Sequence, residues 1–456
     1  MLNGHVSHWW EQIGLPEPRP SLAGHHTADV VIVGAGFTGL WSAYYLAKAQ
    51  PGLQICVLEA HHVGYGASGR NGGWLTNTVT GGRERYLKTS GYHAAQAFQL
   101  AMNATVAEVI TVCQVEGISA DIQQGGEFEV AYTEAQENRL RDQARAEAQW
   151  LGTDCQLLER EQATAKIRVA GTRAALWHPH AARIHPAKLV KALAEVVEKL
   201  GVKIYENTRV NVIRPRQVEA SAGTVNAEYI LRATEGFTAG IKGHKRLWLS
   251  MNSSMIATEP LSQGLWDEVN WSQGEVLGDF AHVYMYAQRT ADDRIAIGGR
   301  GVPYKFGSRT DIDGQTPQVT VDKLRDVLHR MFPQTVSARI DHAWSGVLGV
   351  PRDWAATVGL DPATGLGWAG GYVGTGVATT NLAGRTLRDL VLGESTALTA
   401  LPWVNHRARR WEPEPLRWIA TKALYAAYGQ ADRQEANGRS ATSPIAHLAD
   451  LLTGKP

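Results

Sequence analysis

The clearest hydrophobic pattern in the chain is a short unbroken apolar run followed by glycines and then by helical spacing. Residues 29–33 read Asp-Val-Val-Ile-Val, and residues 34–39 read Gly-Ala-Gly-Phe-Thr-Gly. A run of this length is typical of a buried parallel strand. Apolar residues then recur at helical spacing over 38–49, and a second apolar strand is predicted at 53–59. The order predicts one βαβ unit with a glycine turn after its first strand.

The remaining pattern alternates between helical and strand-like segments. Two long helices are predicted, at 93–116 and 186–200, and the latter carries its apolar residues on one stripe. Strand patterns are found at 119–132, 202–206, 209–213, 227–233, 256–258, 284–289 and 294–297. The chain returns to the character of its first βαβ unit near 355–392 and ends in a helical tail. The pattern therefore predicts that separated segments build one nucleotide-binding domain. The segments between them would build a second domain with its own sheet.

Composition and charge narrow the class of protein. At 456 residues the chain exceeds the size at which one core keeps growing, so two domains are expected. The 45 basic and 44 acidic side chains leave a net charge of +1, which provides no field for nucleic-acid binding. Residues 1–22 lack the apolar core of a signal peptide, and no uninterrupted apolar window of about 18 residues predicts a spanning helix. We expect a cytoplasmic protein without nucleic-acid partners.

The glycine turn carries the first chemical signal. Gly34 would permit the tight turn, Gly36 would let a pyrophosphate approach the backbone, and Gly39 would let the helix pack against the strand. The helix N-terminus offers free N–H groups and a positive dipole end to phosphates. Glu59 ends the second strand, where it can accept hydrogen bonds from a ribose diol. This context, including Phe37 and Thr38, predicts a dinucleotide site.

A second small-residue loop favours FAD over NAD. Residues 64–74 read Gly-Tyr-Gly-Ala-Ser-Gly-Arg-Asn-Gly-Gly-Trp, and such a loop can follow an extended cofactor past its phosphates. Together with the glycine turn, the sequence Leu-Glu-Ala at 58–60 and the segment at 370–387, it resembles the D-amino-acid-oxidase-like superfamily of FAD-dependent oxidoreductases. The branch most similar is that of the bacterial γ-glutamylputrescine oxidoreductases. The resemblance covers roughly residues 25–395 and implies a flavin, a C–N bond substrate and two domains.

The resemblance also implies roles for individual residues. The loop residues would line the pyrophosphate and ribityl path, and Trp74 would approach the isoalloxazine edge. Val210 would contact the adenine through its backbone. The segment 374–377 would face the pyrimidine ring, and the helix 378–392 would direct its dipole at the reduced flavin. The residues concerned are Ser68, Arg70, Asn71, Gly72, Gly73, Trp74, Val210, Gly374, Thr375, Gly376 and Val377.

Departures from relatives are equally informative. Sarcosine-oxidase relatives attach flavin through a late cysteine, whereas the three cysteines here are Cys56, Cys113 and Cys155. We therefore expect non-covalent FAD. Neither the internal motif of flavin monooxygenases nor the cysteine pair of disulfide reductases is found, which disfavours both activities.

Candidates for the substrate pocket come from strands that the resemblance places over the flavin. Tyr284 and Tyr286 could face the cavity, or pack within the sheet. Arg300 could pair with a substrate anion, or form a salt bridge between domains. Trp344 could pass close to the flavin, or belong to the core. No catalytic side chain is assigned, because the flavin N5 would accept the hydride and a neutral amine needs no strong base.

Two further features have competing interpretations. His178, His180 and His185 lie close together in sequence, but no acidic or cysteine ligand accompanies them at metal-ligand spacing, so we predict a loop and no metal. The tail helix at 415–433 places Leu416, Ile419, Ala423 and Ala427 on one face, with arginines nearby. Contact with a membrane surface is conceivable, but docking on the protein itself is preferred.

The sequence favours an FAD-dependent amine oxidase with an α/β fold. Such an enzyme would oxidise a primary or secondary amine and pass electrons to O2. The alternatives are a dehydrogenase passing electrons to a quinone or carrier, and a non-catalytic flavoprotein subunit. A Rossmann-type FAD-binding domain is expected from 28–90, 170–240 and 340–400, and an α+β substrate domain with an antiparallel sheet from 91–169 and 241–339. Residues 1–27 would form a polar lead-in, and 401–456 a helical tail.

Overall fold

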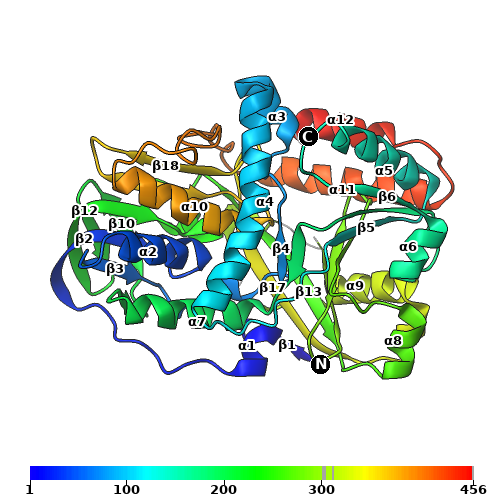
Figure 1. Cartoon of the computed structure of the whole chain (residues 1–456), viewed down its shortest axis with the longest axis horizontal. Coiled ribbons are helices and arrows are strands. Elements are labelled where there is room, and N and C mark those ends of the chain that lie inside the picture. Colours follow the sequence, from blue (N-terminus) through cyan, green and yellow to red (C-terminus); the bar gives the residue numbers. More distant parts are fainter. Residues whose placement is uncertain (300–303, 311–312, 454–456) are drawn as a thin grey trace.

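Two large β-sheets stand side by side in the computed structural model, which describes residues 1–299, 304–310 and 313–453. One sheet lies at the left of Figure 1 and the other at the right, and the long helix α4 (Tyr92–Val115) runs down the middle of that view. The division into an α/β part and a part with a largely antiparallel sheet agrees with the expected fold class.

The eight-stranded sheet carries the glycine turn. Strands β12, β2, β3 and β9 are parallel neighbours, and β19 lies parallel to β12. In β2, Val30 and Ile32 face the core beneath the helices, and Val31 and Val33 face a separate core on the opposite side. Burial of both faces explains the unbroken apolar run. The strands are β2 (Gly24–Val33), β3 (Ile55–Leu58), β9 (Lys203–Tyr205), β10 (Val210–Arg214), β11 (Gln217–Ala220), β12 (Gly223–Arg232), β18 (Thr357–Asp361) and β19 (Leu366–Gly370).

Three helices pack with one another and with α4 over this sheet. They are α2 (Phe37–Ala49), α7 (Pro186–Lys199) and α10 (Gly376–Val391), which confirms the helices predicted at these places. A Cβ at Gly384 would lie 2.8 Å from the Cβ of Trp41. Glycine at this position therefore lets α10 and α2 approach closely, so that both helices begin at the same edge of the sheet.

The nine-stranded sheet forms the other half of the molecule. Phe128, Ile256 and Ile297 lie on its buried face with residues of α8 (Gln263–Val269) and α9 (Gln318–Met331). Its strands, in spatial order, are β1 (Leu2–Asn3), β17 (Ile340–Val350), β13 (Leu249–Thr258), β16 (Ile295–Gly299), β15 (Met285–Arg289), β14 (Val276–Asp279), β5 (Glu127–Ala131), β7 (Ala174–His178) and β6 (Gln156–Glu159). A small sheet pairs β4 (Trp74–Thr76) with β8 (Ala181–Arg183). α5 (Glu134–Glu147) and α6 (Arg160–Lys166) pack on this sheet, whereas α3 (Arg83–Ser90) packs against α4.

Two segments expected in the FAD-binding domain belong instead to the nine-stranded sheet. β17 pairs with β13 from Ile340 to Val350, and β7 pairs with both β5 and β6. The expected ranges 170–240 and 340–400 are therefore wrong at these strands. The reason is that strand pairing between distant segments, and not the local apolar pattern, assigns a strand to its sheet.

The first 27 residues are also more than a polar lead-in. β1 pairs with β17, and the short helix α1 (His8–Ile13) buries Trp9 and Trp10. The Trp9 indole N–H donates to the carbonyl of Asn71 at 2.8 Å, and the Ser7 hydroxyl donates to the carbonyl of Gly69 at 2.7 Å. The N-terminal segment thus supports the second glycine-rich loop from outside.

Helix α4 is the one helix among the described residues that is long and apolar enough to cross a membrane. Within this molecule it packs into the main core through Phe98, Met102 and Val109. Length and composition alone are weak evidence of a span, and a helix buried in the core of a protein satisfies the same test.

The tail forms two helices that dock on the nine-stranded half, α11 (Leu416–Ala436) and α12 (Pro444–Thr453). The apolar face expected for this tail is wrong. Leu416 and Ile419 are 59% and 53% exposed, whereas Tyr428 and Ala431 are buried. The buried side is chosen by partners elsewhere in the chain, such as the carbonyl of Lys245, to which the buried Arg417 donates at 3.2 Å.

Candidate active site

The glycine turn has the geometry that its sequence predicts. Gly34 has φ +108°, and a Cβ there would lie 2.6 Å from the carbonyl oxygen of Ala233. A Cβ at Gly39 would collide with the carbonyl oxygen of Gly34. Both positions therefore exclude side chains, and the turn holds the start of α2 close to the end of β2.

Two helix N-termini face the same cavity. α2 begins after Gly36 and α10 begins after Thr375, and in neither helix does the side chain of the N-cap residue bind the first turn. Thr38 of α2 and Tyr372 before α10 are joined through their hydroxyl groups at 3.0 Å. Free N–H groups and the helix dipoles at these ends favour negatively charged ligand groups.

Glu59 lies directly after β3 and lines this cavity. Its carboxylate accepts hydrogen bonds from the backbone N–H of Ala35 at 2.9 Å and of His61 at 3.0 Å. Burial raises the pKa of the Glu59 carboxyl, and these N–H groups oppose that effect. Glu59 thus joins the glycine turn to the segment that follows β3.

The second glycine-rich loop packs against the first. The Ser68 hydroxyl accepts a hydrogen bond from the N–H of Phe37 at 2.8 Å, at the start of α2. Gly73 has φ +70°, and its N–H donates to the Asn71 side chain at 2.8 Å. The carbonyl of Gly72 accepts from Gln288 at 2.7 Å. The loop is therefore held by α2 on one side and by the nine-stranded sheet on the other.

Arg70 and Trp344 support this loop from behind. The Arg70 guanidinium donates to the carbonyls of Tyr65 at 2.6 Å and Ser345 at 3.3 Å and stacks on the Tyr65 ring. The buried indole of Trp344 donates to the carbonyl of Arg70 at 2.9 Å. Trp344 does not line either cavity described here, so its assignment as a substrate-binding residue is wrong, and its alternative assignment to the core holds.

The predicted cofactor residues converge on one cavity, the cofactor cavity. Its lining includes, from the predicted set, Gly34, Gly36, Phe37, Thr38, Glu59, Ser68, Asn71, Val210, Gly374, Gly376 and Val377. A second cavity, the inner cavity, adds Arg70, Gly72, Trp74 and Thr375. Gly39 and Gly73 lie behind the lining and act through the backbone.

The inner cavity is continuous with the cofactor cavity. Both are lined by Ala67, Asn71, Leu348, Gly374 and Val377. The inner cavity has a volume of about 660 Å³, within the range of roughly 300–1,000 Å³ usual for small-molecule sites. An extended cofactor in the first cavity would therefore reach the second with one end.

The two predicted tyrosines line the inner cavity. The Tyr286 hydroxyl is 2.8 Å from the Ser253 hydroxyl, and the Tyr286 ring lies against Gly72. Tyr284 also lines it, with its hydroxyl near Gly374. Arg300 lies outside the described residues, so its role as a partner for a substrate anion stays a prediction.

Glu235 is an important residue that the sequence analysis did not find. It follows β12 and accepts backbone hydrogen bonds from Gly349 at 3.1 Å, Gly371 at 2.8 Å and Tyr372 at 3.2 Å. Burial raises the pKa of the Glu235 carboxyl to about 7, although these bonds oppose the rise. The three backbone hydrogen bonds to Glu235 join β17 to the segment that leads into α10. The available signal was an acidic residue shortly after a predicted strand, as at Glu59.

Three acidic residues of the inner cavity were also missed. Glu127 and Glu129 lie on β5 and Asp279 ends β14, and all three contribute to the lining. The signal was present in the sequence Glu-Phe-Glu-Val at 127–130, where acidic and apolar residues alternate as on a half-buried strand.

The three histidines considered for a metal site make their contacts with different residues. His178 lies 3.4 Å from Glu127, His180 pairs with Asp154 at 2.7 Å, and His185 packs on Trp9. His178 ends β7 and β8 begins at Ala181, so much of the segment predicted as a loop is strand, and the rings of His178 and His180 lie 6.2 Å apart.

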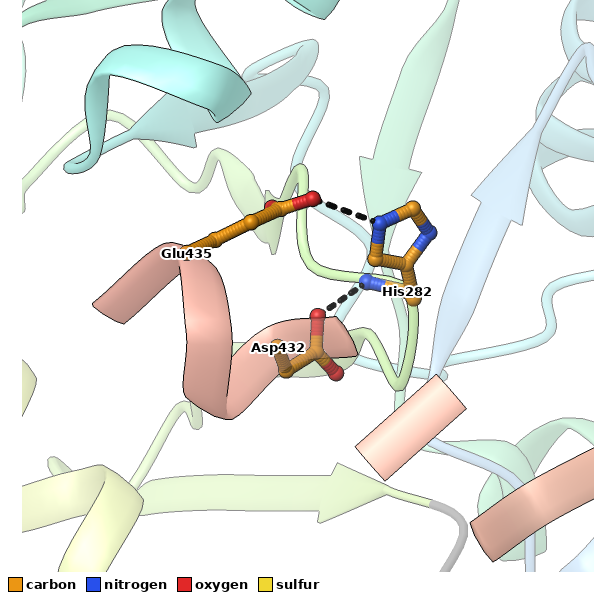
Figure 2. A group of neighbouring side chains, drawn as sticks. All are labelled: His282, Asp432 and Glu435. Atoms are coloured by element: carbon orange, nitrogen blue, oxygen red, sulfur yellow. Dashed lines mark hydrogen bonds and ion pairs between the residues drawn. The ribbon is translucent and has the colours of Figure 1, made fainter. Parts of the chain in front are cut away.

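A different cluster, His282 with Asp432 and Glu435, brings three potential ligand atoms together among the described residues (Figure 2). Both oxygens of Asp432 accept backbone N–H groups, from His282 at 2.8 Å and Val283 at 2.9 Å. Glu435 accepts from the His282 ring at 2.9 Å and from Arg139 at 2.8 Å. Because these groups already bind one another, the cluster fastens α11 to the nine-stranded sheet.

The residues that line the cofactor cavity fit a dinucleotide. The evidence is steric and electrostatic: glycines whose Cβ atoms would collide, two uncapped helix N-termini on one cavity, and an acidic residue after the second strand. The continuous inner cavity provides the space for a reacting ring and a substrate.

Comparison with known proteins agrees with this geometry. The family described as FAD dependent oxidoreductase (DAO) matches residues 29–390. Gamma-glutamylputrescine oxidoreductase of Escherichia coli (strain K12) is 30% identical over 398 residues, which cover 85% of this chain and 89% of that protein. Probable oxidoreductase OrdL of Rhizobium meliloti (strain 1021) is 27% identical over 402 residues, covering 86% and 90%.

Solved structures share the fold. Glycine oxidase from Geobacillus kaustophilus has a TM-score of 0.69 at 22% identity, over 84% of this chain and 99% of that one. L-proline dehydrogenase from P. horikoshii has a TM-score of 0.67 at 20% identity, over 84% and 96%. The family match over most of the chain and the cofactor cavity lead to one conclusion: the chain belongs to the DAO family of FAD-dependent oxidoreductases, enzymes that act on the C–N bond of amines or amino acids with non-covalent FAD.

Proposed function

We propose that this enzyme oxidises a small primary or secondary amine and passes the electrons to O2. The substrate would be an amino acid, a polyamine derivative or an aminophosphonate. The carbon next to nitrogen loses a hydride and the nitrogen a proton, so that the C–N single bond becomes a C=N double bond. Water then hydrolyses the imine, and O2 takes up two electrons and two protons to leave as hydrogen peroxide. The continuity of the cofactor and inner cavities is the observation that carries this proposal.

The roles of the cofactor residues follow from their positions. We propose that Glu59 binds the adenosine ribose, that the Val210 backbone contacts the adenine, and that the starts of α2 and α10 bind the pyrophosphate and the flavin pyrimidine edge. The uncapped N-termini of both helices support these assignments. When bound, FAD supplies the acceptor for the hydride.

The side chains of the inner cavity would orient the amine and exclude water. Tyr284 and Tyr286 line the cavity, and the Tyr286 ring lies against Gly72 and makes an edge contact with Trp74. Positioning of this kind accounts for a large part of catalysis when the cofactor performs the chemistry. No acid–base side chain is assigned a proton-transfer role.

Two other functions compete with this one. The enzyme would be a dehydrogenase if its electrons went to a quinone or carrier, and a non-catalytic flavoprotein if no amine reduced its flavin. The apolar residues exposed on α11 leave membrane contact open, but the docking of the tail on the nine-stranded half favours a protein of the cytoplasm.

A panel of amines separates these functions. The purified protein is mixed without O2 with amino acids, di- and polyamines, and aminophosphonates, and loss of flavin absorbance at about 450 nm is followed. Peroxide release in air then identifies the acceptor. Bleaching with peroxide supports the oxidase, bleaching without peroxide supports the dehydrogenase, and the absence of bleaching with every amine contradicts both.

A further inference from the structure

The carboxylates on one face of β5 point into the inner cavity. Phe128 and Val130 point into the core of the nine-stranded sheet, so Glu127 and Glu129 point the other way. Gly278 of β14 lies opposite Glu129 in the parallel pairing, and Asp279 follows it. The strand alternation therefore concentrates acidic groups at one wall of the cavity.

Two of these carboxylates have protein partners. Glu127 accepts a hydrogen bond from the Thr76 hydroxyl and lies 3.4 Å from His178. Asp279 accepts from the Tyr132 hydroxyl at 2.7 Å and from the N–H of Met285 at 3.0 Å. These contacts satisfy the carboxylates of Glu127 and Asp279, which explains why both can be buried.

Glu129 differs from both. No hydrogen bond or ion pair joins its carboxylate to the described part of the chain, and the charged groups that act on it are Glu127, Glu147 and Asp279. Burial and these three carboxylates raise the pKa of the Glu129 carboxyl well above its usual value. A largely buried carboxylate among like charges is costly unless a cation joins it.

Glu129 also lies where a ligand would pass. A Cβ built on Gly278 would be 3.3 Å from the Trp74 ring and 3.7 Å from Oε1 of Glu129. The absence of a side chain at Gly278 thus leaves the carboxylate beside Trp74, at the wall that the loop 64–74 shares with the cofactor cavity.

The cations of the inner cavity are committed elsewhere. Arg139 makes two hydrogen bonds to Glu435, at 2.9 and 2.8 Å, and one to the carbonyl of Phe280 at 2.7 Å. Arg70 donates to backbone carbonyls beneath the loop. His447 also lines the cavity but is exposed, so a cationic group of the ligand is the group that we expect to balance Glu129.

We propose that Glu129 binds a second, non-reacting ammonium group of the substrate, and hence that the substrate is an aliphatic diamine or polyamine. This inference rests on the proposed amine oxidation. The reacting nitrogen must be neutral to release a hydride from its neighbouring carbon, whereas an amine held by a carboxylate stays protonated. Glu129 therefore suits the distal nitrogen. An α-amino acid would bring its own carboxylate towards this acidic wall and would be disfavoured.

The test compares amines of matched length. Putrescine and butylamine differ by the distal ammonium group, and spermidine extends the series. For the holoenzyme we expect kcat/KM for putrescine or spermidine to exceed that for butylamine by roughly 10- to 100-fold, as a charge-assisted hydrogen bond provides. In Glu129→Gln the ratio falls towards one. Glu129→Asp keeps the charge and recovers part of the preference.

The matched control is Glu134→Gln, which removes one charge from the exposed start of α5 and should leave the ratio unchanged. FAD content and melting temperature of Glu129→Gln show whether the fold is intact. A wild-type ratio in Glu129→Gln, or a preference of the wild type for glycine over both amines, overturns the inference and leaves amine oxidation standing.

Binding without turnover separates the two proposals. Spermidine binding to the holoenzyme is measured by calorimetry in the absence of O2. If no amine reduces the flavin, yet spermidine binds to the wild type and at least 10-fold more weakly to Glu129→Gln, amine oxidation fails and the role of Glu129 stands. If spermidine binds both proteins equally, the inference about Glu129 fails.

Discussion

At Gly36 a single methyl group is enough to disturb the cofactor cavity. A Cβ there would lie 2.8 Å from the Ser68 hydroxyl, which in turn holds the N–H of Phe37. We expect Gly36→Val to lose FAD binding altogether, because the side chain displaces Ser68 and enters the path of the pyrophosphate. The flavin-to-protein ratio after gel filtration measures this. Gly264→Val is the control, since no atom lies within 4 Å of a Cβ at Gly264. Stoichiometric FAD in Gly36→Val would show that the turn is only structural.

Glu129 makes stability depend on pH in a direction that can be worked out. Its pKa in the folded protein is raised, so above pH 4.5 the unfolded chain ionises more readily than the folded one. The free energy of unfolding therefore falls as pH rises past this value. The groups facing Glu129 are Glu127, which His178 approaches, Glu147, which pairs with Arg83, and Asp279.

We expect Glu129→Gln to remove this fall in the free energy of unfolding with rising pH. Its melting temperature relative to the wild type should increase between about pH 5 and pH 8, because the amide never carries the unfavourable charge. Differential scanning calorimetry across this range measures the effect. A difference between variant and wild type that stays constant with pH would mean that Glu129 already has a cationic partner in the free protein.

At the scale of elements, the tail helix α11 is fastened by polar contacts and not by an apolar stripe. Burial would raise the pKa of Glu435, but the hydrogen bond from His282 (Figure 2) and those from Arg139 outweigh burial and lower this pKa to about 2. A lowered pKa means that the carboxylate stabilises the folded protein above pH 4.5 and that this contribution is lost as pH falls towards 2.

We expect Glu435→Gln to loosen the tail at neutral pH, at a cost on the order of 2 kcal/mol for the charge-assisted bonds that it removes. Hydrogen exchange of residues 416–436 should become faster in the variant. In the wild type the same acceleration should appear only on acidification below about pH 4. Equal exchange in both proteins at pH 7 would place the attachment of α11 in its apolar contacts, such as those of Tyr428.

At the scale of the whole molecule, FAD would join parts of the chain that are far apart in sequence. Its cavity is built by the turn at 34–39, the loop at 64–74, Val210 and the segment 374–377. A ligand that binds only the folded state raises the free energy of unfolding, by about 2.7 kcal/mol at a hundred times its dissociation constant. Removal of FAD should therefore lower the melting temperature, and added FAD should restore it in a concentration-dependent way. A melting temperature independent of FAD would contradict the assignment of this cavity.

The sequence by itself determined the local geometry of this protein. The βαβ unit, the glycine turn and the helices over 186–199 and 376–391 follow from the spacing of apolar residues and from glycines at which an added Cβ would have no room. Steric exclusion at Gly39 arises within the turn, where a Cβ would meet the carbonyl oxygen of Gly34, so a short stretch of sequence was sufficient there. The loop at 64–74 contributes residues to the lining of both cavities, and their contacts with a cofactor stay a prediction.

Only the tertiary structure decided how distant segments share a sheet or a charge. β17 pairs with β13, the first residues support the loop at 64–74, and α11 buries a different face from its apolar one, each through partners far away in sequence. The same is true of the acidic wall. Alternation shows that Glu127 and Glu129 share a face. That Glu127 has a partner and Glu129 has none among the described residues depends on which side chains the fold brings within hydrogen-bond distance. Because such contacts join residues with no local relation, their energies become visible only in three dimensions.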